Sequence, residues 1–205
     1  MGIGIGRLKM SIPNIHFQRS WVYEQKWWEF RLTKPPRISE EAANQLFKQI
    51  KERKPLFEHL LGEITRTLQI TWKRKEIEVT MIALFIGSFS KPLTISLSDA
   101  HGHPNDIEDL IDIIIHELIH NALNEHPQIN AALTKIRTDY PDEPFLTHIH
   151  ILVHALHMTL YEQHRGMDRA QRDIDKSALH PSYAKAWQIV TKEGAENILN
   201  KYLSD

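Results

Sequence analysis

Two histidines and a glutamate near the middle of the chain have a spacing that suits metal chemistry. The segment His116-Glu117-Leu118-Ile119-His120 places its histidines four residues apart, and on an α-helix such residues project from one face and can share one metal ion. Glu117 is held beside them, where a carboxylate can take a proton from a metal-bound water and later pass it to a leaving amine. The segment therefore indicates a hydrolytic metal site with His116 and His120 as ligands and Glu117 as general base.

The surroundings of this segment favour a metal over coincidence. The chain of 205 residues has 13 histidines and no cysteine, which excludes thiolate ligands and disulfides, so any metal is held by imidazole, carboxylate or water. In a sequence of this composition, chance gives about 0.06 matches to HExxH. The motif also lies in a long apolar helix, in which burying unpartnered histidines and a glutamate would be costly.

The run IIIHELIH, together with the strand and helix expected before it, resembles the zincin metallopeptidases. This likeness implies a zincin-like fold, Zn²⁺ as cofactor and a peptide or protein as substrate. In that superfamily the last strand before the metal helix is an edge strand that binds the substrate in extended form. The corresponding segment here is 91–98, where backbone pairing would set the register of the peptide.

The third zinc ligand distinguishes two branches of the zincins. His126 lies at the metzincin-like spacing, but Leu123 replaces the glycine with which that family turns its chain. The gluzincin-like alternative takes the ligand from a later helix, usually as a glutamate. Here the later helix carries a polar row at helical spacing along one face, formed by His150, His154, His157 and Tyr161.

We prefer the later helix, because a row of histidines among core-facing residues needs a metal or hydrogen-bond partners. We rank His154 first, His150 second and His126 third. His157 and Tyr161 are candidates for orienting a ligand or for stabilising the transition state, as is Tyr183. Overall the chain is most similar to minimal, single-domain gluzincin-like peptidases.

The elements that must position these residues give an α+β domain over 1–205. We expect a small, mostly antiparallel sheet, with strands at 68–72, 76–86 and 93–97, packed on a buried motif helix, and Ser39 and Asn105 as helix N-caps. The predicted parts are an aromatic and basic N-terminal segment over 1–38, helices over 39–67, the sheet over 68–98, the metal-binding helix over 105–125 and further helices over 128–205.

Charge and aromatic residues are distributed unevenly along the chain. Residues 1–75 carry 15 Lys/Arg against 7 Asp/Glu, and residues 76–205 carry 10 against 19. We expect these halves to complement each other and the aromatic residues of 15–33 to pack on the core. Two alternatives remain: a zinc-binding regulatory protein with little turnover, and a peptidase associated with nucleic acid through its basic aromatic segment. We expect no membrane partner and a cytoplasmic location, because no signal peptide or membrane-length apolar run is present.

Overall fold

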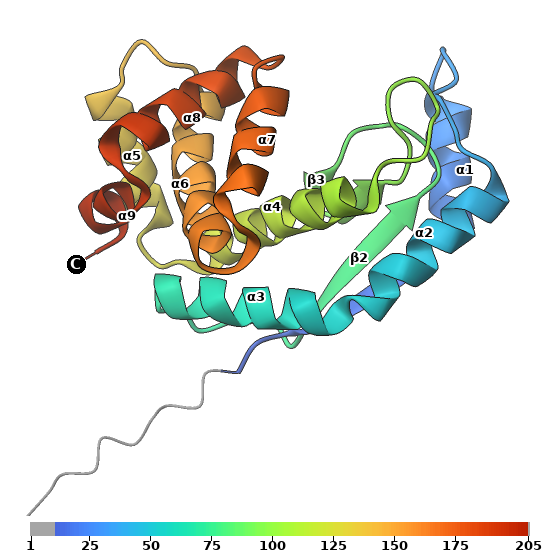
Figure 1. Cartoon of the computed structure of the whole chain (residues 1–205), viewed down its shortest axis with the longest axis horizontal. Helices are drawn as coiled ribbons and strands as arrows, with labels where there is room; N and C mark the ends of the chain where they lie inside the picture. The colour runs from blue at the N-terminus through green and yellow to red at the C-terminus, as the bar shows by residue number, and fades with distance from the viewer. Residues whose placement is uncertain (1–10, 205) are drawn as a thin grey trace, which may run out of the picture.

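The computed structural model describes residues 11–204 and has an α+β architecture. The helices after residue 128 gather on one side of the molecule, and the sheet and the helices over 21–52 lie on the other (Figure 1). The helices over 54–68 and 107–125 extend between the two sides. The strands are β1 (Asn14–Arg19), β2 (Glu76–Ile82), β3 (Phe89–Ser90) and β4 (Leu93–Ser96). The helices are α1 (Trp21–Phe30), α2 (Glu40–Glu52), α3 (Lys54–Leu68), α4 (Ile107–Glu125), α5 (Ile129–Asp139), α6 (Phe145–Leu160), the π-helix η1 (Tyr161–Arg165), α7 (Met167–Ser177), α8 (Pro181–Glu193) and α9 (Ala195–Leu203).

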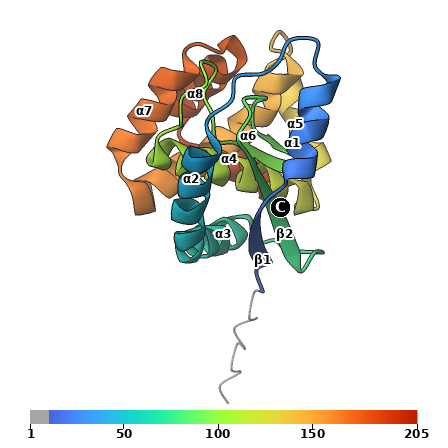
Figure 2. The same ribbon diagram turned by 90° about the vertical axis from the view of Figure 1, so that its right-hand side faces the viewer.

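The sheet is mixed, with the strand order β1-β2-β4-β3. The strand β1 pairs with β2 in parallel, as Figure 2 shows, and β2 pairs with β4 in parallel. Only β3 is antiparallel to its neighbour β4. The prediction of a mostly antiparallel sheet is therefore wrong, because three helices connect β1 to β2, and such a long crossover allows parallel pairing.

Two predicted strand positions also differ in the structure. Residues 68–72 form no strand, because α3 continues to Leu68 and the left-handed Gln69, at φ 51°, ends it. Beyond this turn, the Trp72 indole N–H donates to Thr65 Oγ1 at 2.8 Å. The segment 91–98 contains β4, which lies between β2 and β3, so the edge strand of this part of the sheet is β3 and not the predicted segment.

Local capping interactions explain where two helices begin. Ser39 caps α2 as predicted, its hydroxyl accepting from the Ala42 amide at 3.2 Å. The cap of α4 is Asp106 and not Asn105, because Asp106 accepts from the amides of the first helical turn. Asn105 instead donates through Nδ2 to the Ser96 carbonyl at 3.0 Å. This bond attaches the start of α4 to the end of β4.

The aromatic N-terminal segment forms β1 and α1, and most of its rings do not enter the core. Trp21 is 66% exposed and Phe30 is 81% exposed, so the prediction that the aromatic residues of this segment pack on the core is wrong for α1. Trp27 lies instead against Phe89 of β3, with ring centroids 6.2 Å apart. The residue that α1 buries is Glu24.

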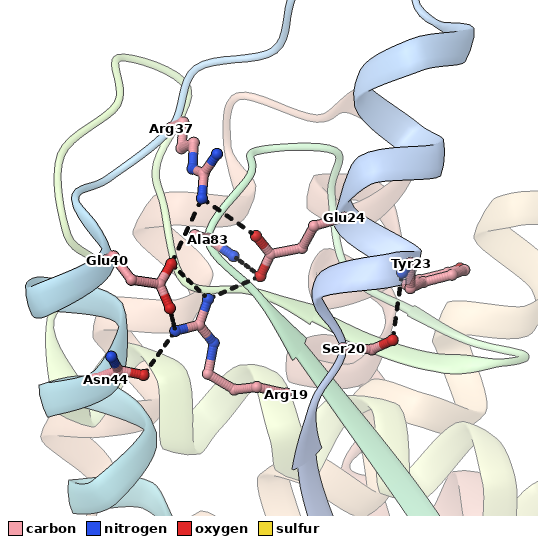
Figure 3. Close-up of polar contacts among 8 residues, drawn as sticks. All are labelled: Arg19, Ser20, Tyr23, Glu24, Arg37, Glu40, Asn44 and Ala83. Carbon is pink, nitrogen blue, oxygen red and sulfur yellow. Dashed lines mark hydrogen bonds and ion pairs between the residues drawn. The ribbon is translucent and has the colours of Figure 1, made fainter.

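Glu24 belongs to a polar cluster that joins α1 to the sheet and to α2 (Figure 3). Its carboxylate accepts from Arg19 at 2.9 Å and from the Ala83 amide at 3.0 Å. Arg19 also donates to Glu40 at 2.6 Å. Both bonds to the carboxylate reach Oε1, whereas Oε2 has no hydrogen-bond partner among the described residues and lies 3.8 Å from Arg37 Nη2. The bonds to Oε1 and the two guanidinium groups offset the cost of burying this carboxylate, so α1 turns Glu24, and not its aromatic residues, toward the protein.

Among the described residues, no helix has both the length and the apolar character needed to cross a membrane. The first ten residues, on which the expectation of no signal peptide depends, lie outside the part of the chain that the structure describes.

Candidate metal centre

The motif helix α4 runs through the middle of the protein and is buried along most of its length. It packs against α3 and the sheet on one side and against α6 on the other, and its apolar residues Ile114, Ile115, Leu118 and Ile119 are fully buried. Packed elements therefore surround the helix, which defines the positions of its polar residues. It therefore presents the two motif histidines toward α6.

His116 and His120 point their Nε2 atoms at the same place. These nitrogens lie 3.2 Å apart, close to the separation of about 3.3 Å that two ligands have on a tetrahedral zinc ion. Burial lowers the pKa of His120 to about 3, and burial and the neighbouring histidines hold the pKa of His116 well below its usual value. Both imidazoles are therefore neutral at pH 7, which is the form that binds metals.

His150 of α6 completes a group of three. One ring nitrogen from each of His116, His120 and His150 lies within 4.8 Å of the other two. The Nδ1 of His150 donates to the Leu146 carbonyl at 2.8 Å, which fixes the tautomer and leaves a lone pair on Nε2. That Nε2 is buried and has no hydrogen-bond partner among the described residues. An orphaned acceptor aimed at two others fits a metal ligand.

His154, which the sequence analysis ranks first, lies one turn beyond this group. Its ring centroid is 5.9 Å from that of His116, and it is not among the three residues whose ring nitrogens converge. The ring stacks on Trp187 of α8 at 4.2 Å, with an angle of 11° between the planes. The geometry thus favours His150 over His154 as third ligand, which reverses our ranking from the sequence.

His126, the metzincin-like candidate, lies away from the other motif residues. It follows the last residue of α4, and its Nδ1 accepts from the Gln128 amide at 3.2 Å. It lines a separate cavity together with Gln69 and Glu196. It is not part of the group formed by His116, His120 and His150.

His157 and Tyr161 continue the polar row of α6 into the protein. Their rings stack at 4.3 Å, and His157 Nδ1 lies 3.6 Å from Asp173 of α7. Burial lowers the pKa of His157 to about 3, and it raises the pKa of Tyr161 far above its usual value. Tyr161 is fully buried, and neither residue lines the cavity beside Glu117. The ring of His157 lies 5.9 Å from that of His116, so these residues pack beside the group of three histidines and away from the cavity.

Glu117 lies at a cavity of about 590 Å³ together with His116 and Tyr183. The side chain is only 7% exposed, and burial raises the pKa of its carboxyl to about 8. A divalent cation beside it favours the charged carboxylate and lowers this pKa. A metal bound at the three histidines would therefore make Glu117 an effective base near neutral pH.

Tyr183 of α8 also lines this cavity. Its ring stacks on His150 at 4.0 Å and lies 6.2 Å from the ring of His116. Its pKa is raised by burial and by the charge of Glu117, which keeps the phenol protonated and able to donate. Tyr183 is a candidate from the sequence through its residue type alone, because α8 lies more than 60 residues beyond the motif and no local pattern places it at the site.

Comparisons with known proteins find no match to this chain, either among protein-family models, among curated proteins or among solved structures.

Proposed function

We propose that this protein is a zinc-dependent metallopeptidase with a zincin-like arrangement, in which His116, His120 and His150 hold Zn²⁺ and Glu117 is the general base. The observation that carries this proposal is the convergence of three imidazole nitrogens within 4.8 Å, next to a buried glutamate that lies at a cavity. Three protein ligands with an open fourth position are typical of catalytic zinc.

The residues around the cavity suit amide hydrolysis. Zinc, when bound, supplies a Lewis acid that raises the acidity of water and polarises the scissile carbonyl. Glu117 takes a proton from the attacking water and passes it to the leaving amine. Tyr183 donates a hydrogen bond to the carbonyl oxygen as negative charge develops there. His150 holds its ring by donating to the Leu146 carbonyl, which orients Nε2 toward the metal.

The edge strand β3 is the element that suits an extended substrate. The cavity at Glu117 is lined by Gly87 and Ser88, just before β3, and a second cavity of about 330 Å³ is lined by Ser90, Lys91 and His120. In the described part of the chain no strand pairs with the outer edge of β3, and this strand lies between two cavities that include His116 and His120 in their linings. A peptide that pairs with β3 would pass the metal, so we propose peptides or unfolded proteins as substrates. We propose the cytoplasm as the location of the protein itself.

The position of β3 is fixed by a residue of the motif helix. Asn121 donates through Nδ2 to the Ser90 carbonyl at 3.3 Å and to the Glu117 carbonyl at 2.9 Å. Because Asn121 follows His120 directly, the edge strand is attached to the turn of α4 that carries the metal ligands. This contact supports a fixed distance between a bound peptide and the catalytic group.

The test of this function is peptide hydrolysis with and without zinc. We expect the zinc-loaded protein to cleave members of a diverse peptide mixture, detected by mass spectrometry, because the metal supplies the Lewis acid. A chelator should abolish cleavage, and added zinc should restore it. A folded, zinc-loaded protein that cleaves no peptide in the mixture would contradict the proposal. It would favour the alternative of a zinc-binding regulatory protein.

The retained general base is the feature that separates these two functions. A zinc ion that only joins helices needs ligands but no base, whereas Glu117 is buried at a cavity without serving as a ligand in the group of three histidines. Burying a carboxyl group there costs free energy, and a purely structural metal site would not require it. This is why we place hydrolysis above a purely structural metal.

A further inference from the structure

A second group of residues of metal-binding types lies partly exposed on α3 and η1, and it shares no residue with the group of His116, His120 and His150. His59 and Glu63 lie one turn apart on α3, and His164 comes from η1. One ligand atom from each of the three lies within 4.8 Å of the others. Glu63 is 4.0 Å from His59 Nδ1 and 3.9 Å from His164 Nε2.

The chemistry of this group suits a borderline divalent cation. Two imidazoles and one carboxylate are a ligand set that zinc accepts, with water in the fourth position. Ligand atoms on tetrahedral zinc are about 3.3 Å apart, so small side-chain rotations would close the site. The rings of His59 and His164 are 5.1 Å apart and nearly perpendicular, and His59 is more than half exposed, which leaves room for these rotations.

Arg66 competes with a metal at this group, because it forms an ion pair with Glu63. The hydrogen bond from Arg66 lowers the pKa of Glu63, so the carboxylate is charged and ready to act as a ligand. Arg66 itself is 61% exposed and can turn into water at little cost, because an ion pair with an exposed partner contributes little to stability. A cation can therefore replace Arg66 as the partner of Glu63.

The position of this group gives the metal a structural effect. The π-helix η1 continues α6 directly, and α6 carries His150. The helix α3 packs against α4, which carries the motif histidines. We propose that His59, Glu63 and His164 form a second zinc site that clamps α3 to η1 and thereby braces the two helices that hold the first site. Departures from regular α-helix such as η1 often occur at functional sites.

The experiment compares zinc binding by the full chain after chelation and equilibrium dialysis against zinc alone. The variant His59→Ala/His164→Ala should bind one zinc ion fewer per chain than the wild type. We expect its affinity for this ion to fall at least about 100-fold, since residues that merely orient a ligand already contribute about 10- to 100-fold. The difference isolates the second site whether or not the first site binds zinc.

Two further variants make the result specific. The matched control His101→Ala/His103→Ala removes two other exposed histidines, whose rings are 6.2 Å apart, and should bind as much zinc as the wild type. Glu63→Gln keeps both imidazoles and should still weaken binding. Equal zinc binding by the wild type and the His59→Ala/His164→Ala variant, or an equal loss in the control, would overturn the second site.

Discussion

Replacing Glu117 by glutamine is expected to lower peptide hydrolysis about 10²- to 10⁴-fold without removing zinc. The substitution keeps the size of the side chain and removes only its ability to take a proton. The three converging nitrogens belong to His116, His120 and His150, so the metal should remain. The measurement is kcat/KM for a cleaved peptide, together with zinc content per chain.

A glutamate on the same helix provides the control for this variant. Glu108, in the first turn of α4, is partly exposed and pairs with Arg165 at 2.6 Å. Glu108→Gln should leave both activity and zinc content close to those of the wild type, because Glu108 belongs neither to the group of three histidines nor to the lining of the cavity at Glu117. If Glu117→Gln retained full activity, Glu117 would not be the base, and another group would have to take the proton.

The second large effect concerns the choice between two neighbouring histidines. We expect His150→Ala to weaken zinc binding at the first site by at least about 100-fold, because it removes a ligand. His154→Ala should retain the ion, because His154 stacks on Trp187 and lies outside the group of three. Zinc titration of both variants, with circular dichroism to confirm folding, gives the answer.

The opposite pattern would restore the ranking from the sequence. Zinc loss in His154→Ala combined with retention in His150→Ala would mean that α6 is displaced by about one turn relative to α4 when metal binds. The stacking of His150 on Tyr183 at 4.0 Å and its bond to the Leu146 carbonyl both argue for the geometry described here.

The parts of the fold that the sequence predicts well depend on local patterns. Ser39 followed by acidic residues marks the start of α2, and the apolar run before His116 marks the motif helix. Gly194 separates α8 from α9, at φ 86°, where the sequence allows a break in a long helical pattern. Capping residues, glycines and periodicity act within one or two turns, so they can be found in a single sequence.

The parts that were missed depend on contacts between distant segments. The strand β1 pairs with β2, and their register joins Phe17 to Val79, so a partner more than 60 residues away decides that this segment is a strand. The exposure of Trp21 depends on Glu24, which α1 buries against Arg19. Hydrophobic content alone predicts that α1 buries its aromatic face. No local pattern shows that the Glu24 carboxylate will find buried partners and turn the other face of α1 toward the protein.

The third ligand shows the same limit within the candidate site. His150, His154 and His157 share one face of α6, so periodicity groups them but cannot order them. The order depends on where α4 crosses α6, and this crossing brings the ring of His120 to 5.1 Å from that of His150. The HExxH spacing, in contrast, lies within one helix and needs no tertiary information.

The most direct test of the account is elemental analysis of the wild type beside His116→Ala/His120→Ala, after both have been dialysed against zinc and then washed. The predicted result is one zinc ion fewer per chain in the variant, because the two residues supply two of the three converging nitrogens. Equal zinc content in the two proteins, or a folded wild type that takes up no zinc, would contradict the central claim.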